Sequence, residues 1–195
     1  MPAALDTFPA LLFAHADVRG SRPAIREKDL GIWQTLTWSQ VAEHVRQVAH
    51  GLASLGIQPG MHVAVIGENR PRLYMAMMAA QSLGAIPVPL YQDAVAQEMV
   101  YVLQDAEISV AVVEDQEQVD KMLEVREQCP ALKHVVYDDP RGLRHYTDAM
   151  LLSYDRLEEI GRDYAAQHPD FFARAVAAVQ PHDAAAMFYT SGTTG

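Results

Sequence analysis

His62-Val63-Ala64-Val65-Ile66-Gly67 is a short apolar run, rich in β-branched residues and ended by glycine, a pattern typical of a buried strand. A helix is predicted next, because Asn69 and Pro71 form a helix start and Gly84 a helix stop. A second strand follows over Ala85–Leu90. This order of strand, helix and strand favours two parallel strands joined by a helix that covers one face of the sheet.

The same alternation continues along the chain. Helices are predicted over Ala94–Ala106 and in a segment that ends near Gln128, and strands over Ile108–Val113 and His134–Tyr137. From Ser153 onward the pattern changes to two consecutive helices. We therefore expect an α/β fold with a largely parallel sheet flanked by helices.

Two prolines limit how the strand over Ala85–Leu90 can pair. Pro87 and Pro89 both lack a backbone N–H and, two residues apart, point the same way. One side of the strand is therefore unable to pair fully. This predicts that the strand lies at an edge of the sheet or leaves the sheet early.

The residues before His62 predict a helix, a hairpin and a second helix. Phe8–Val18 has the pattern of a short amphipathic helix, and Arg22–Lys28 and Ile32–Trp38 resemble two strands joined by a turn. Thr37, followed three places later by Gln40, forms a capping box that predicts the start of the next helix.

The end of the chain carries the strongest functional signal. Ala184–Tyr189 is a short apolar run, which predicts a buried strand, and glycines and small hydroxyl residues follow it. Hydroxyls and free backbone N–H groups of such a loop can solvate phosphate oxygens. The candidate phosphate-binding residues are Thr190, Ser191, Gly192, Thr193, Thr194 and Gly195. The alternative is a polar surface turn, and the loop is not a Walker A motif because it has no lysine.

Tyr189–Gly195 resembles the phosphate-loop signature of the adenylate-forming superfamily, which includes acyl-CoA synthetases, peptide-synthetase adenylation domains and luciferases. Leu36–Val41 and Gln81–Leu90 resemble the first and second core motifs of that family, in the family's order, although a helix start and a helix-to-strand turn also explain them. Arg26–Trp33 and Glu68–Pro71 resemble long-chain acyl-CoA synthetases more than the amino-acid-activating branch.

The resemblance implies that residues 1–195 are an incomplete N-terminal AMP-binding domain that ends at the phosphate loop, with the C-terminal domain absent. It implies an enzyme that uses ATP, Mg²⁺ and coenzyme A to convert a fatty acid first to an acyl-adenylate and then to an acyl-CoA. Within this chain it implies no catalytic residue. The family's loop lysine would follow Gly195, so we expect the 195 residues alone to be inactive.

Composition and charge narrow the classes of partner. The net charge is −10, and the sequence has no cluster of basic residues interleaved with aromatics, which argues against nucleic acid. The single cysteine, Cys129, excludes a disulfide within the chain and fits a reducing, cytoplasmic setting. No apolar run approaches the roughly 20 residues of a membrane span, but peripheral membrane contact stays open. The pattern does not indicate an oligomeric state.

No protein metal site is predicted. The eight histidines lack ligand spacing, since His44 and His50 are six apart and do not share a helix face. Asp138 and Asp139 precede a Pro-x-Gly segment and are predicted to form a solvated turn.

Two other functional classes remain open at this point. The chain could be a non-catalytic α/β module, or a degenerate fragment, that binds a partner through exposed sheet or loop surface. A P-loop NTPase is disfavoured because the Walker lysine is absent. A Pro-Lys-Gly continuation after Gly195 would favour the adenylate-forming enzyme, and an immediate stop codon would favour the module.

Overall fold

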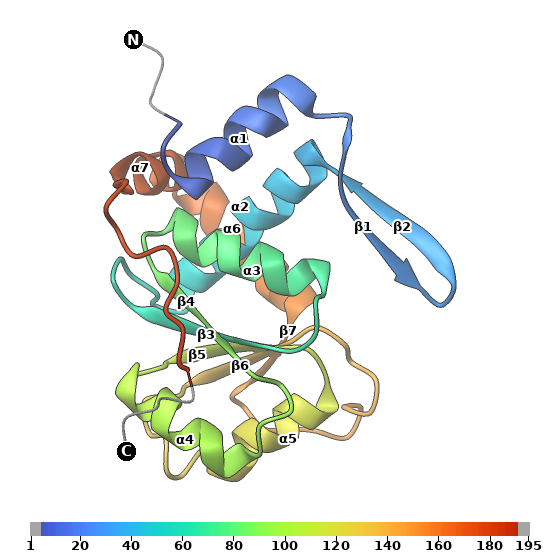
Figure 1. The fold of residues 1–195 in the computed structure, drawn as a ribbon, viewed down its shortest axis with the longest axis vertical. Helices are drawn as coiled ribbons and strands as arrows, with labels where there is room; N and C mark the ends of the chain where they lie inside the picture. The colour runs from blue at the N-terminus through green and yellow to red at the C-terminus, as the bar shows by residue number, and fades with distance from the viewer. Residues whose placement is uncertain (1–4, 191–195) are drawn as a thin grey trace.

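The computed structural model describes residues 5–190, which form a five-stranded parallel sheet between two layers of helices, with a separate hairpin at one side (Figure 1). The strands of the main sheet, in spatial order, are β4 (Ile86–Leu90), β3 (His62–Ile66), β5 (Val110–Val113), β6 (His134–Tyr137) and β7 (Leu151–Ser153). All four strand pairs are parallel, which confirms the predicted fold class.

Helices cover both faces of this sheet (Figure 1). One layer contains α1 (Phe8–Arg19), α2 (Trp38–Ser54), α3 (Pro71–Ser82), α6 (Tyr154–Gln167) and α7 (Phe171–Ala178). The other layer contains α4 (Ala96–Asp105) and α5 (Gln116–Val125). Alternate residues of β3 supply the two cores: Val63 and Val65 pack under the first layer, and Ala64 and Ile66 under the second. Burial on both faces explains why the strand is apolar throughout.

The start of α2 has the capping box that the sequence predicts. The Thr37 hydroxyl accepts a hydrogen bond from the Gln40 N–H at 3.3 Å, and the Gln40 side-chain oxygen accepts one from the Thr37 N–H at 2.8 Å. Further along, Gly51 of α2 and Gly161 of α6 allow the two helices to approach closely, because a Cβ at either position would overlap the backbone of the other helix. These two features fix where α2 begins and how α6 packs on it.

The hairpin is an antiparallel pair, β1 (Pro23–Asp29) and β2 (Ile32–Thr37), which projects from the helical layer (Figure 1). Its two-residue turn has positive φ at both positions, 45° at Leu30 and 84° at Gly31. This is the pattern of a type I′ turn, whose twist suits a hairpin.

The edge position predicted for the proline-containing strand is confirmed. β4 pairs only with β3 among the described residues, in the register Pro87 to Val63. The carbonyl of Pro87 faces away from β3 and accepts a hydrogen bond of 3.0 Å from the Met187 N–H.

The buried strand predicted over Ala184–Tyr189 is wrong. These residues have no regular secondary structure and are exposed or half-buried. The physical reason lies in β4: a parallel neighbour needs N–H donors from the outward-facing residues of β4, and Pro87 and Pro89 have none. The single hydrogen bond from Met187 to Pro87 is therefore not extended into a ladder.

The structure differs from the sequence interpretation in two smaller ways. The sequence interpretation missed β7, a strand of only three residues that pairs with β6. Asp138 and Asp139 are not a freely solvated turn, because both are partly buried and paired with arginines. Within residues 5–190, no helix has the length and apolar character to cross a bilayer.

Candidate functional site

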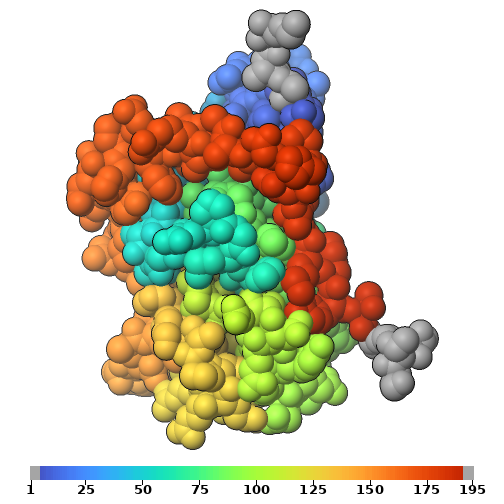
Figure 2. All heavy atoms as spheres, turned by 90° about the vertical axis from the view of Figure 1, so that its left-hand side faces the viewer, coloured from blue at the N-terminus to red at the C-terminus, as the bar shows by residue number. Residues whose placement is uncertain are grey.

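The segment that leads to the predicted phosphate loop is attached to the body at three points. The Gln81 side-chain amide donates a hydrogen bond of 2.7 Å to the Ala185 carbonyl, and Met187 donates to Pro87. The Tyr189 hydroxyl donates a hydrogen bond of 2.6 Å to the carboxylate of Asp105. Figure 2 shows this segment, in red, running over the surface beside the sheet toward α4.

Tyr189 contacts two residues of α4, Tyr101 and Asp105. Its ring packs edge-on against Tyr101, with 6.1 Å between the ring centres. Desolvation and the hydrogen bond to Asp105 raise the pKa of Tyr189 to about 12. The hydroxyl therefore stays protonated at neutral pH and acts as a donor to the carboxylate.

Of the predicted phosphate-binding residues, only Thr190 lies within the described range, and it is exposed. Ser191, Gly192, Thr193, Thr194 and Gly195 lie outside the described residues. The structure thus describes the approach to the loop. The segment before the loop contacts Asp105, at the carboxyl end of α4, through Tyr189.

A second polar region lies at the carboxyl ends of the strands. In the order β4-β3-β5, the chain passes from β3 to β4 on one side and then crosses to β5 on the other side. Open α/β sheets bind ligands at this type of switch point. Here Gly67 and Glu114 directly follow β3 and β5.

Glu114, directly after β5, forms hydrogen bonds with the segment that follows β3. Its carboxylate accepts a hydrogen bond of 2.5 Å from the Glu68 N–H and one of 2.7 Å from Arg70 Nε. Gly67 has a φ of 152°, and a Cβ there would lie 2.5 Å from the Cβ of Glu114 and 2.6 Å from a Leu73 methyl carbon. Only glycine therefore fits between the two strand ends.

Arg72 joins the end of β6 to the start of α6. Its guanidinium donates to Asp138 at 3.1 Å and to Asp155 at 2.6 Å, and lies 4.9 Å from the centre of the Tyr154 ring. Burial raises the pKa of Asp138, and the nearby Arg72 charge partly opposes this effect. Next to them, Arg141 pairs with Asp139, and this hydrogen bonding lowers the pKa of the Asp139 carboxyl.

These side chains and the hairpin enclose a cavity of about 550 Å³. Its polar lining residues are Glu27, Asp29, Gln34, His44, Arg70, Arg72, Glu114, Asp138, Asp139 and Arg141. The Nδ1 atom of His44 lies 2.7 Å from the buried carboxylate of Glu158. The lining is rich in carboxylates, and its three arginines already pair with carboxylates, so it does not have the excess positive charge that phosphate groups require.

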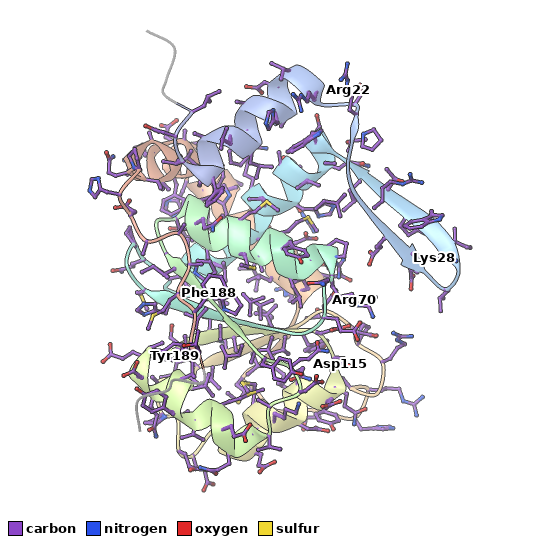
Figure 3. All side chains as sticks on the ribbon, in the orientation of Figure 1. Arg22, Lys28, Arg70, Asp115, Phe188 and Tyr189 are labelled. Atoms are coloured by element: carbon purple, nitrogen blue, oxygen red, sulfur yellow. The ribbon has the colours of Figure 1, made fainter. Side chains whose placement is uncertain are left out.

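The two regions do not form one site in this structure. The segment before the loop lies at the edge of the sheet where the strands begin. Its hydrogen-bond partners Gln81 and Asp105 are near the carboxyl ends of α3 and α4, the helices that lead into β4 and β5. In Figure 3, Tyr189 lies next to α4 at the left end of the strands, and Arg70 lies at their right end, toward the hairpin.

The strand-end cavity was missed in the sequence interpretation, although a signal existed. Charged residues follow three predicted strands immediately, at Glu68, Glu114 and Asp138. Parallel strands place their carboxyl ends at one edge, so this pattern could have predicted that these residues meet. Within residues 5–190, no group of three histidine, cysteine or acidic side chains is arranged to hold a metal ion.

Comparison with curated proteins gives long-chain-fatty-acid–CoA ligases among the relatives of this chain. The chain is 32% identical over 190 residues to the long-chain-fatty-acid–CoA ligase FadD15 of Mycobacterium bovis, covering 97% of this chain and 30% of that protein. It is 28% identical over 177 residues to the long-chain-fatty-acid–CoA ligase ACSBG2 of Xenopus laevis, covering 90% of this chain and 23% of that protein. The chain thus spans less than a third of the length of these relatives.

Solved structures share the fold. The acetoacetyl-CoA synthetase from Streptomyces lividans superposes with a TM-score of 0.69 and 21% identity, over 78% of this chain and 25% of that one. The anthranilate CoA ligase AuaEII, solved in complex with anthranoyl-AMP, gives a TM-score of 0.66 and 23% identity over 77% of this chain and 26% of that one. The sequence model of the AMP-binding enzyme family matches residues 12–195, and the chain therefore belongs to that family.

Proposed function

We propose that this chain is part of an ATP-dependent fatty acid–CoA ligase of the AMP-forming type. The observation that carries the proposal is the family match, which extends through the Tyr189–Gly195 motif and coincides with relatives named as long-chain-fatty-acid–CoA ligases. In this proposal residues 1–195 supply the first part of the AMP-binding domain.

The proposed reaction has two steps. A carboxylate oxygen of the fatty acid attacks the α-phosphorus of ATP, an O–P bond forms, and the bond to the β-phosphate breaks to release pyrophosphate. The thiol sulfur of coenzyme A then attacks the acyl carbon, AMP leaves with the former carboxylate oxygen, and the thiol proton is lost. Both steps depend on positioning and charge dispersal more than on covalent chemistry from the protein.

The proposed role of Thr190–Gly195 is to hold the departing phosphates. Backbone N–H groups and the hydroxyls of Thr190, Ser191, Thr193 and Thr194 would donate to oxygens of the β- and γ-phosphates. The hydrogen bond from Tyr189 to Asp105 supports this role because it gives the loop a defined starting point.

We infer that Mg²⁺ enters with the nucleotide. Mg²⁺ commonly binds through substrate phosphates and one or two carboxylates and keeps several waters. This mode of binding supports delivery as Mg-ATP, because the phosphates themselves supply ligands. When bound, the ion would neutralise charge on the phosphates.

We also propose a cytoplasmic location with peripheral membrane contact. Cys129 is a buried free thiol, and burial raises its pKa, which keeps it unreactive in a reducing compartment. A long-chain fatty acid partitions into bilayers, so an enzyme that activates it gains from contact with their surface.

The test compares the 195-residue chain with a polypeptide that carries the same residues and reaches the length of the relatives. With ATP, Mg²⁺ and palmitate, the longer polypeptide is expected to release pyrophosphate, and to form palmitoyl-CoA once coenzyme A is added. The 195-residue chain is expected to release none. Thr193→Ala in the longer polypeptide should lower kcat by on the order of tenfold or more, because a phosphate donor is lost.

Arg156→Gln is the matched control, since Arg156 is exposed on α6 and pairs only with the neighbouring Glu159 among the described residues. It is expected to keep full activity. Turnover by the 195-residue chain would contradict the need for later residues. An inactive longer polypeptide that folds and binds neither ATP nor palmitate would favour the non-catalytic module.

A further inference from the structure

The hairpin of β1 and β2 presents two chemically different faces. Residues that oppose each other in its register share a face: Glu27 with Gln34 on one, and Lys28 with Trp33 on the other. The face with Glu27 lines the strand-end cavity. The other, outer face points away from that cavity.

The outer face carries two cations beside an exposed tryptophan. Its members Arg26, Lys28, Trp33 and Thr35 are all exposed, and Trp33 keeps 59% of its surface accessible. The Arg26 guanidinium lies 5.2 Å from the centre of the Trp33 ring. Figure 3 shows Lys28 close to the tip of the projecting hairpin.

The tip adds two exposed apolar side chains, of which Leu30 also borders the strand-end cavity and Ile32, paired with Asp29, lies on the face of Glu27. Leu30 is 84% exposed and Ile32 is 65% exposed. Leu30 also holds a φ of 45°, a conformation that residues with a side chain adopt at a cost. A leucine held in this conformation with its side chain in water makes no contribution to the core.

We propose that the tip and outer face of this hairpin, formed by Arg26, Lys28, Leu30, Ile32 and Trp33, bind the surface of an anionic phospholipid bilayer. Tryptophan favours the headgroup region, Arg and Lys attract anionic headgroups, and Leu and Ile insert at the acyl boundary. The hairpin projects from the body, so its tip can reach a flat surface before the rest of the molecule does (Figure 1).

The acidic body does not oppose this arrangement at physiological salt. The net charge is −10, but the Debye length is about 8 Å, so charges farther than this from the headgroups are largely screened. On the outer face the bilayer then encounters Arg26 and Lys28, whereas Glu27 and Asp29 of the same hairpin lie on the opposite face. A nucleic acid is a poorer match, because the hairpin carries a single aromatic, Trp33, and offers no series of stacking platforms.

This inference deepens the peripheral membrane contact proposed above and rests on it, but it is independent of catalysis. Binding to vesicles requires neither ATP nor coenzyme A. A failure of the adenylation test therefore leaves this inference standing, and a failure of vesicle binding leaves the adenylation proposal standing.

The experiment uses Trp33 as its own reporter. The chain has two tryptophans, so Trp38→Phe leaves Trp33 as the only one. Vesicles of phosphatidylcholine with about 30% phosphatidylserine should shift Trp33 emission to the blue and cosediment with the protein, whereas pure phosphatidylcholine vesicles should do so weakly.

Two variants test the two parts of the surface. Arg26→Glu with Lys28→Glu should lower the partition coefficient on anionic vesicles by about tenfold or more, since each basic residue adds several-fold. Leu30→Asn removes the more exposed of the two apolar tip residues but suits the type I′ turn, so it should weaken binding while the hairpin stays folded. Arg144→Glu with Arg174→Glu makes the same change in net charge at two exposed sites elsewhere and should bind like the parent.

The outcomes are distinct. A parent that binds anionic vesicles, with the hairpin variants weakened and the control unchanged, supports the inference. A parent that binds while both hairpin variants bind equally well overturns the hairpin surface and leaves peripheral contact in place. A parent that binds no vesicle, or that binds an oligonucleotide through Trp33 in place of vesicles, overturns both.

Discussion

The hydroxyl of Tyr189 donates a hydrogen bond of 2.6 Å to the carboxylate of Asp105, a residue 84 positions earlier at the end of α4. This contact attaches the residues before the predicted phosphate loop to the helical layer formed by α4 and α5. It replaces the strand pairing that the apolar sequence over Ala184–Tyr189 predicts.

Tyr189→Phe should release this segment without unfolding the protein. The substitution removes one partly exposed hydrogen bond, which contributes about 1 kcal/mol to stability. Amide hydrogen exchange over residues 184–190 should speed up, while exchange in β3 and β5 stays unchanged. Tyr101→Phe, which keeps the ring against Tyr189, is the control, and equal exchange in both variants would show that Asp105 does not anchor the segment.

The same hydrogen bond should depend on pH in the alkaline range. The pKa of Tyr189 is raised from 10.0 to about 12, so the contact is fully present below pH 10.0 and is lost as the pH rises through about 12. Ultraviolet difference titration should therefore show one fewer late-ionising tyrosine in Tyr189→Phe than in the parent protein. Buried Tyr154, whose pKa is also raised, should remain late in both proteins.

Gly67→Ala should destabilise the protein by about 2 kcal/mol or more, because the added methyl overlaps Glu114 and Leu73 at a backbone angle that favours glycine. Urea unfolding measures the loss. Gly60→Ala is matched for positive φ but has open space around its Cβ, so it should lose only about 1 kcal/mol. Equal losses would show that the packing at the switch point adds nothing.

Protonation of His50 should destabilise the fold in mild acid. The residue is buried among Tyr164, Phe171 and Phe172, and burial lowers its pKa below 6.5 although its Nδ1–H donates to the Arg46 carbonyl. Its Nε2 has no partner among the described residues. Below pH 6.5 the unfolded chain binds a proton that the folded chain does not, so stability falls as the pH decreases toward the folded pKa.

The check is the free energy of unfolding between pH 7 and pH 5 in the parent and in His50→Leu, which keeps an apolar side chain at this position. The parent should lose up to about 1.4 kcal/mol more per pH unit than the variant. His134, whose pKa burial also lowers, contributes equally to both proteins and cancels in the comparison. Parallel pH profiles would contradict the assignment.

Thr37→Ala should lower the free energy of unfolding by about 1 kcal/mol, because the Gln40 N–H loses its capping acceptor. Thermal unfolding gives the difference. Thr35→Ala changes an exposed hydroxyl in the same strand and should have a smaller effect. A larger effect at Thr35 would show that the hairpin, not the cap, controls this region.

Local patterns in the sequence determined most of the elements. The capping box at Thr37, the apolar β-branched run at β3 and the prolines of β4 each act within one element, so the chain alone predicted the α2 start, a buried strand and an edge strand, as the structure confirms. The sequence also determined the family, because the motif ending at Gly195 and the two earlier motifs lie in the right order.

Only the tertiary structure decided what depends on residues far apart in the chain. The run before Thr190 is apolar enough for a strand, but the only neighbour available among the described residues is β4, whose outward residues have no N–H to donate. The charged cavity needed Gly67, Glu114 and Asp138 to meet at one edge of the sheet, and the two faces of the hairpin needed its register. Such contacts depend on pairing partners and their hydrogen-bonding groups, which local sequence does not contain.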